Sequence, residues 1–484
     1  MKLTQITLAV VAACAAAPSF ALTPAQIDGT TVQLWISGAT APTASVYKAV
    51  RSLCADLDGD GTPADDLHTY VSSNTSGSNA VPGKSAAGKF AAYACTMGPL
   101  AGSLDGVKTI VYHTFDAGSF EAYTPHLYLA GEVNPLVPST LKRMKDLTAS
   151  GSTCTLLTGT SDPANTYVNC GVDTVTLAPN ASPNSLPTLP QGGFSDTEYT
   201  LNQLNLGISK SIDDIGSEAP TNVGQGFGLA VSHALYAQLQ KAQGIITTVG
   251  GTDDACDGNY AAGVCQPTIN RQKYSSLVAA GGVTNKDGSL FGAAAGSVVK
   301  VERRVGTSGT QSSSNAFFLN TPCATGLPSG GLTPAGSNTA GTTSYNGGKV
   351  LVRSNNGSGD VKTQLTAASA NNELAIGVLS LENVPSAAEK FAFVKLNGVS
   401  PNVDAKQRQT AIDGDYEFWY ELVGFTAGSA FSEGVDLVNG TITALGDPAI
   451  TDLTGLFVTK AAGVTGANVS KGAKQGNACS PAIQ

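Results

Sequence analysis

The segment Arg303-Arg304-Val305-Gly306-Thr307-Ser308-Gly309-Thr310 links an apolar run, residues 296–301, to a helix-like run, residues 311–319. The apolar run predicts a strand, so the segment is a turn from a strand into a helix. The first N–H groups of a helix have no partner within it and carry the positive end of its dipole. This layout therefore predicts an anion-binding turn at the carboxyl end of a strand.

The side chains of this turn suit the same purpose. Ser308 and Thr310 offer hydroxyl donors, and Gly309 lets the backbone approach a ligand closely. Arg304 can make a two-pronged charged contact. The alternative interpretation is structural: Ser308 or Thr310 caps the helix, and Arg304 lies in solvent.

The same alternation of strand and helix recurs along the chain. Three further strand-like runs precede a turn or a helix: residues 31–36 before the turn 38–42 and the helix 43–53, residues 108–113 before the turn 117–119, and residues 226–231 before the helix 232–243. Strands alternating with helices predict an α/β fold with a mostly parallel sheet. In such sheets ligands bind beyond the carboxyl ends of the strands, where these turns lie.

Length and charge limit the possible functions. The chain has 484 residues, more than one hydrophobic core usually serves, which predicts two domains. Its formal net charge is −9, and no basic stripe could replace the counterions of a nucleic acid, so nucleic-acid binding is excluded. Because this overall charge repels anions, any anion must be held by local donors. No residue pattern indicates a cofactor.

The N-terminus, residues 1–21, has the pattern of a signal peptide. Lys2 supplies the positive charge, residues 3–17 the apolar run, and Ser19-Phe20-Ala21 a small-residue cleavage site. We expect cleavage after Ala21 and a periplasmic or secreted protein. A lipoprotein signal acylated at Cys14 is the alternative. The apolar run is too short to span a membrane, and no later run approaches the roughly 20 residues required.

Eight cysteines remain once the signal peptide is removed. An even number in an exported chain predicts disulfides. The short spacings favour the pairs Cys154–Cys170 and Cys256–Cys265, which leaves Cys54–Cys95 and Cys323–Cys479. Because the sequence has no CxxC pair and its four histidines are scattered, we do not expect a zinc site.

An acidic turn near the N-terminus matches the opening of a calcium loop, with oxygen ligands at Asp56, Asp58 and Asp60. The twelfth position of such a loop needs a bidentate Glu, and here it is Leu67. A solvated turn is therefore the favoured interpretation, and a bound calcium ion is the alternative.

Three segments together resemble the periplasmic phosphate-binding proteins of phosphate ABC transporters: the turn SGATAP (37–42), the segment RRVGTSGT (303–310) and the run AIGVLSLENVP (375–385). The segments GFGLAVSHALYAQLQ, QPTINRQKYSSL, FAFVKLNGVSP and DGDYEFWYEL are similar to a secreted proteobacterial branch of that group. The resemblance extends from about Gly38 to Tyr420. It implies a two-lobed type II solute-binding fold, each lobe an α/β sheet, with the ligand in the cleft between the lobes.

The resemblance also implies two crossings between the lobes. We expect these crossings near residues 212–224 and 375–379. The expected division is then lobe 1 at residues 22–218 with an insertion at 124–191, lobe 2 at residues 219–376, and the rest of lobe 1 at residues 377–484.

Nine residues are expected to contact the ligand on the basis of this resemblance: Ala39, Thr40, Ala41, Ser119, Asp196, Arg304, Ser308, Gly309 and Thr310. Ala41 stands where the family commonly has an aromatic residue and offers only its backbone N–H. Asp196 matches the Asp of a Ser-Asp pair and is reached only across the insertion.

The carboxylate of Asp196 would distinguish a protonated ligand from an unprotonated one. Hydrogen phosphate keeps a proton that a carboxylate can accept, whereas sulfate has none and would be repelled. Asp196 in the cleft therefore predicts phosphate or another protonated oxyanion. In the alternative, Asp196 caps the helix that follows it, and this discrimination is lost.

The sequence thus predicts a monomeric exported protein that captures inorganic phosphate or a similar oxyanion for uptake or scavenging, with an ABC permease as a possible partner. Two other classes stay open. A secreted phosphatase-like hydrolase would use Ser308 as nucleophile, although no Gly-x-Ser-x-Gly elbow surrounds it and no histidine lies near it in sequence. The third class is a surface or structural protein that has kept the fold and lost the ligand.

Overall fold

The structure is a computed structural model, and it describes most of the chain between residues 22 and 458. The described residues are 22–57, 67–72, 88–116, 118–147, 154–156, 166–178, 189–251, 254–279, 285–323, 340–401, 408–447, 450 and 456–458. The expected signal peptide, Asp58, Asp60 and Cys479 lie outside them.

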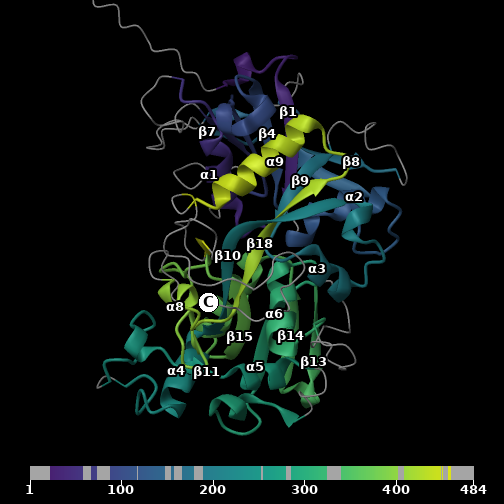
Figure 1. The fold of residues 1–484 in the computed structure, drawn as a ribbon. Coiled ribbons are helices and arrows are strands. Elements are labelled where there is room, and N and C mark those ends of the chain that lie inside the picture. Colours follow the sequence, from purple (N-terminus) through teal and green to yellow (C-terminus); the bar gives the residue numbers. More distant parts are fainter. Residues whose placement is uncertain are drawn as a thin grey trace, which may run out of the picture.

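Two lobes, joined by two long strands, make up the described part of the protein (Figure 1). One mixed sheet continues through both, in the order β13-β14-β12-β15-β10-β18-β9-β1-β4-β3-β2-β7-β6. Each lobe has three neighbouring parallel strands at the centre of its part of the sheet: β9, β1 and β4 in one, and β14, β12 and β15 in the other. Antiparallel strands flank both triplets. The α/β class and the two-lobed arrangement are confirmed.

The first lobe buries its own apolar core around β1 and β4. Its strands are β1 (Val32–Gly38), β2 (His68–Val71), β3 (Phe90–Thr96), β4 (Lys108–Thr114), β6 (Thr155–Leu156), β7 (Thr166–Val168) and β9 (Pro190–Ser195), with β5 (Thr140–Met144) and β8 (Val172–Thr176) as a separate pair. Its helices are α1 (Thr43–Ser52), α2 (Thr124–Leu129), α3 (Tyr199–Leu206) and α9 (Ser432–Leu445), with the short 3-10 turn η3 (Ser119–Ala122) after β4.

The second lobe has a separate apolar core around the apolar strands β12, β14 and β15. Its strands are β12 (Val299–Arg304), β13 (Gly341–Tyr345), β14 (Val350–Asn355), β15 (Leu374–Ser380) and β16 (Phe391–Phe393), with β11 (Thr268–Ile269) and β17 (Lys395–Leu396) as a separate pair. Its helices are α4 (His233–Ala242), α5 (Arg271–Val278), α6 (Gly309–Leu319), α7 (Ser358–Ala370) and α8 (Gln409–Ile412).

Two antiparallel strands carry the chain between the lobes: β10 (Gly216–Ser232) and β18 (Trp419–Ala427). The short strand β19 (Leu456–Val458) pairs with the middle of β10. Along β10, Val223 belongs to the core of the first lobe and Phe227 to that of the second. Along β18, Trp419 belongs to the second core and Leu422 to the first. Both crossings thus lie where these two strands pair.

The position of the second crossing corrects the sequence analysis, which placed it near residues 375–379. Those residues form β15, whose Val378 and Leu379 lie in the cores of the second lobe. The chain stays in that lobe through β16, which pairs with β10. The described residues between 377 and 418 therefore belong to the second lobe, because β15 pairs there with β12 and β10.

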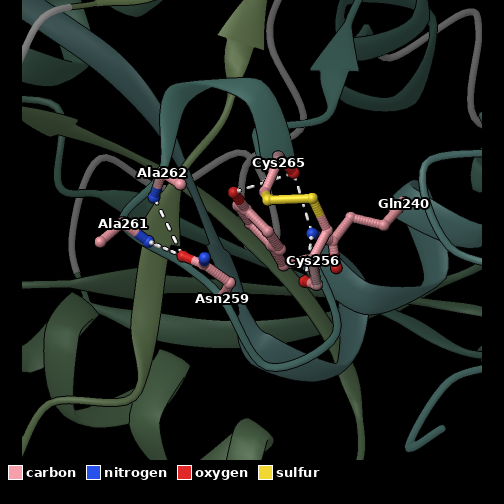
Figure 2. Close-up of a disulfide and its surroundings, with 7 residues drawn as sticks. Gln240, Cys256, Asn259, Ala261, Ala262 and Cys265 are labelled. Carbon is pink, nitrogen blue, oxygen red and sulfur yellow. Dashed lines mark hydrogen bonds between the residues drawn. A yellow bond between two sulfur atoms is a disulfide. The ribbon is translucent and has the colours of Figure 1, made fainter. Parts of the chain in front are cut away.

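Three of the expected disulfides are present, at Cys54–Cys95, Cys154–Cys170 and Cys256–Cys265. Cys323 is disulfide-bonded as well. Figure 2 shows the Cys256–Cys265 bridge, where the Gln240 side chain donates to the carbonyl oxygens of both cysteines at 3.0 and 2.8 Å. Disulfides of this kind are typical of an oxidising compartment outside the cytoplasm. Within the described ranges, no helix has the length and apolar character to cross a membrane.

Candidate anion-binding site

The six strands of the two parallel triplets all end at one small cavity between the lobes. Each contributes a residue at or just beyond its carboxyl end. The cavity is lined by Thr40 and Ala41 after β1, Gly118 and Ser119 after β4, Asp196 after β9, Arg304, Ser308 and Thr310 at and after β12, Ser358 after β14, and Ser380 at the end of β15. Parallel strands bring their carboxyl ends to the same edge of a sheet, which explains why segments far apart in sequence meet here.

Arg304 provides the positive charge of this cavity. It is the last residue of β12 and is 5% exposed, so the alternative of a solvated arginine is wrong. Its Nη1 donates to Ser358 Oγ at 2.8 Å, and its Nη2 donates to the Asn356 carbonyl oxygen at 3.0 Å. Its Nε has no hydrogen-bond partner in the described part of the chain. Burial lowers the pKa of Arg304 to about 10, which leaves the guanidinium charged at neutral pH.

The Ser-Gly-Thr turn opens α6 as the sequence predicts. Ser308 occupies the N-cap position, but its side chain makes no capping hydrogen bond, and Thr310 lies within the first turn. The capping alternative is therefore wrong, and both residues line the cavity. The Gly309 N–H donates to Ser119 Oγ at 3.2 Å, so Gly309 joins the lobes instead of lining the cavity.

In the first lobe the turn after β1 faces the cavity through two of its three expected residues. Thr40 and Ala41 line it, and Thr40 Oγ1 donates to the Phe115 carbonyl oxygen at 3.2 Å. Ala39 is buried and does not line it, because its N–H donates to the Phe194 carbonyl oxygen at 2.7 Å. Gly38, with a φ of 137°, lets β1 lie this close to Phe194.

Asp196 lies in the wall of the cavity and is 4% exposed. Helix α3 begins at Tyr199 with Glu198 in the N-cap position, so Asp196 does not cap it. Asp196 Oδ1 is buried and has no hydrogen-bond partner within the described residues. Burial raises the pKa of Asp196 to about 6, against the opposing effects of Ser119 and the Arg304 charge. A carboxylate with a free oxygen thus stands beside the arginine.

Sequence reasoning missed three of the lining residues: Gly118, Ser358 and Ser380. It also missed Glu382, a half-buried residue whose Oε1 accepts a hydrogen bond from Ser380 Oγ at 2.6 Å. Burial raises the pKa of Glu382 to about 7. The one signal in the sequence for these residues is position, since Ser358 and Ser380 end or follow apolar runs in the manner of Arg304.

The cavity has a volume of about 10 Å³, close to the space that one water molecule needs. The lobes are therefore closed around it, and the walls must separate for an oxyanion to enter. Two hydrogen bonds tie the walls together at this point: the Gly309–Ser119 bond and one from the Phe120 N–H to the Thr307 carbonyl oxygen at 3.3 Å.

The four histidines lie outside the cavity lining. Burial lowers the pKa of His113 to about 3 and that of His126 to about 4, so both are neutral at physiological pH. No group of His, Cys, Asp or Glu that could hold a metal ion occurs within the ranges described. Of the expected calcium ligands only Asp56 is described, and that interpretation stays untested.

Comparisons with known proteins give weak likenesses. No known protein family matches this chain, and no curated protein matches its sequence. A solved structure from Clostridium perfringens, provisionally assigned as a phosphate ABC transporter substrate-binding protein and holding phosphate, aligns with 87% of this chain and 99% of its own at 10% identity and a TM-score of 0.37. A possible phosphate-binding protein from Planctomyces limnophilus aligns with 82% of each chain at 10% identity and a TM-score of 0.27.

Proposed function

We propose that this protein is an exported solute-binding protein that captures inorganic phosphate, or a similar protonated oxyanion, between its lobes. The observation that carries the proposal is the pairing of a buried arginine with a buried carboxylate that has a free oxygen, Arg304 and Asp196, in one closed cavity. Around them stand Ser119, Ser308, Thr310 and Ser358, each with a hydroxyl group, whereas the hydroxyl proton of Thr40 is already donated to the Phe115 carbonyl oxygen. Such a set can donate to several oxygens of a tetrahedral anion.

The N-terminal ends of three helices add positive electrostatic potential at the cavity. Helices α1, α6 and α7 begin beside the cavity, so their positive ends approach it. These local donors offset the net charge of −9, which by itself repels an anion. Asp196 supplies the selectivity, because it can accept the proton of hydrogen phosphate and repels sulfate.

The residues that line the cavity favour a binding protein over a hydrolase. Ser308 would need a general base to act as a nucleophile, and no histidine lines the cavity among the described residues. Asp196 does not fill this role in the described residues, since no hydrogen bond joins it to Ser308. We therefore propose a monomeric binding protein for uptake or scavenging, partnered by an ABC permease if it serves transport.

Calorimetric titration of the mature protein with phosphate and with sulfate tests this function. We expect phosphate to bind and sulfate to bind at least about 100-fold more weakly, because an unpaired buried charge costs several kcal/mol. Arg304→Ala should weaken phosphate binding by roughly ten- to a hundredfold or more, since it removes charge-assisted hydrogen bonds. Arg304→Lys should recover only part of that loss, because a lysine lacks the two-pronged geometry.

Arg51→Ala is the matched control. Arg51 lies in the last turn of α1, away from the cavity, and its loss should leave phosphate binding unchanged. Absence of phosphate binding by the wild-type protein would favour a surface or structural role. Equal affinity for sulfate would refute the selectivity assigned to Asp196.

A further inference from the structure

The end of β15 holds a second carboxylate beside the cavity. Glu382 Oε1 accepts from Ser380 Oγ at 2.6 Å and from Asn383 Nδ2 at 3.0 Å, and its Oε2 accepts from Gln225 Nε2 at 3.3 Å. These donors come from β15, the segment after it, and the crossing strand β10. Glu382 is thus held on three sides, close behind Ser380, which lines the cavity.

The direction of the Ser380 hydrogen bond decides what that hydroxyl can do. Its single proton is donated to Glu382, so its oxygen can only accept from the cavity side. Asn383 Nδ2 approaches the same oxygen at 3.3 Å and takes one of its two lone pairs. The other lone pair remains for a ligand. A cavity built from hydroxyl donors therefore contains an acceptor at this point.

The net charge of the groups around the cavity limits the charge of the ligand that this acceptor can serve. The charged groups that bear on Glu382 are Asp196 after β9 and Arg304 at the end of β12. Asp360, in the first turn of α7, acts on the same arginine. One guanidinium thus faces three carboxyl groups. If Asp196 and Glu382 were both ionised, a doubly charged hydrogen phosphate would meet an excess of negative charge.

One extra proton removes this conflict. The buried, unpartnered Oδ1 of Asp196 can accept one hydroxyl proton of the ligand. Ser380 can accept a second, with Glu382 behind it. Burial raises the pKa of both carboxyl groups, to about 6 for Asp196 and about 7 for Glu382, so a proton shared with the ligand is retained near neutral pH.

Resting on the proposed oxyanion function, we propose that Ser380 and Glu382 form a second proton acceptor, so that the site selects tetrahedral oxyanions carrying two hydroxyl groups. The preferred ligand is then the singly charged dihydrogen form of phosphate. No covalent bond changes. Relative to free hydrogen phosphate and two ionised carboxylates, the bound complex holds one additional proton taken from solvent.

Phosphate titrations of the wild-type protein and of Glu382→Gln from about pH 6 to about pH 9 test this proposal. In the wild type, affinity should fall by about tenfold per pH unit in the alkaline range, because each binding event takes up one proton. In Glu382→Gln the amide removes the second negative charge, so the alkaline fall should largely disappear. Calorimetry in two buffers of different ionisation enthalpy should show uptake of about one proton by the wild type at pH 8 and close to none by the variant.

Glu373→Gln is the matched control. Glu373 precedes the opposite end of β15 and pairs with Lys300, so the variant removes the same charge next to the same strand without touching the cavity. Its pH profile should match that of the wild type. If Glu382→Gln does not fold, Ser380→Ala provides a second test of the acceptor. It keeps every charge, and it should weaken phosphate binding by roughly ten- to a hundredfold at neutral pH.

The outcomes separate the two proposals. No phosphate binding by the wild type at any pH would overturn the oxyanion function itself. Phosphate binding with the same pH dependence in the wild type and in Glu382→Gln would leave that function standing and overturn the second acceptor. Unchanged phosphate affinity in Ser380→Ala would overturn it as well.

Discussion

At the scale of single residues, Asp196 is placed where it opposes folding. Its carboxyl group is almost fully buried, has a free oxygen, and has a pKa raised to about 6. In the unfolded chain its pKa is near 4. The folded protein therefore binds this proton more tightly than the unfolded chain does, and the ionised carboxylate destabilises the fold above that pH. Such a group is expected where ligand recognition needs it.

Asp196→Asn should accordingly stabilise the ligand-free protein at alkaline pH. The wild type gains stability as pH falls from about 7 to about 4, and the variant lacks this contribution. We expect the free energy of unfolding of the variant to exceed that of the wild type by about 2 kcal/mol at pH 8, with the difference vanishing near pH 4. Urea denaturation without phosphate at both pH values measures it.

The control for this prediction has the opposite sign. Hydrogen bonding from the Ser103 hydroxyl, and from the Ser103 N–H at 2.8 Å, lowers the pKa of Asp436 on α9. Asp436→Asn should therefore lose stability at pH 8, not gain it. A lower stability of Asp196→Asn at pH 8 would contradict the assignment of Asp196 as a destabilising ionised group.

At the scale of elements, local turns were predictable and distant strand ends were not. Arg304, Ser308 and Thr310 lie in one contiguous strand-to-helix turn, so their chemistry can be read from the sequence. Ser358 and Ser380 carry no motif of their own, and only the sheet order β14-β12-β15 brings them beside Arg304. The position of the second crossing was mispredicted for a similar reason, because an apolar run such as β15 fits a strand of either lobe equally well.

Gly309 tests how tightly the start of α6 fits against the first lobe. A Cβ atom at this position would lie 2.3 Å from Ser119 Oγ and 2.9 Å from Asp196 Cβ. We expect Gly309→Ala to lower phosphate affinity by at least about tenfold, because overpacking of this size costs about 1–3 kcal/mol. The thermal midpoint should change little, since separation of the lobes relieves the clash. Calorimetry and thermal denaturation measure the two effects.

Gly359→Ala is the control for this helix-start substitution. Gly359 lies in the first turn of α7, and a Cβ atom there would meet nothing within 4 Å. Phosphate affinity should therefore stay at the wild-type value. If Gly309→Ala bound phosphate as well as Gly359→Ala, the close approach of α6 to Ser119 would have no part in binding.

At the scale of the whole molecule, closure is maintained by neutral hydrogen bonds between the lobes. Besides the contacts at Ser119 and Thr307, α6 is joined to α3. Ser312 Oγ donates to Asn202 Oδ1 at 2.9 Å, and Asn315 Nδ2 donates to Asn205 Oδ1 at 3.2 Å. Because the lobes close over a cavity of about 10 Å³, the walls must separate for an oxyanion to enter and close around it for retention. These bonds thus favour the state that holds the ligand.

Removing the bonds between α3 and α6 should therefore affect release more than capture. The double variant Ser312→Ala with Asn315→Ala loses two bonds of the closed state, about 1–3 kcal/mol in all. We expect the phosphate dissociation rate to rise by roughly 5- to 150-fold in stopped-flow measurements, with a nearly unchanged association rate. Thr363→Ala is the control: the Thr363 hydroxyl donates to the Gly359 carbonyl oxygen of its own helix, so its loss should leave both rates unchanged. The bonds between α3 and α6 are already broken in the open state that the ligand enters, so their loss should not slow association. Slower association without faster release would therefore contradict this role and would mean that the two helices shape the open state.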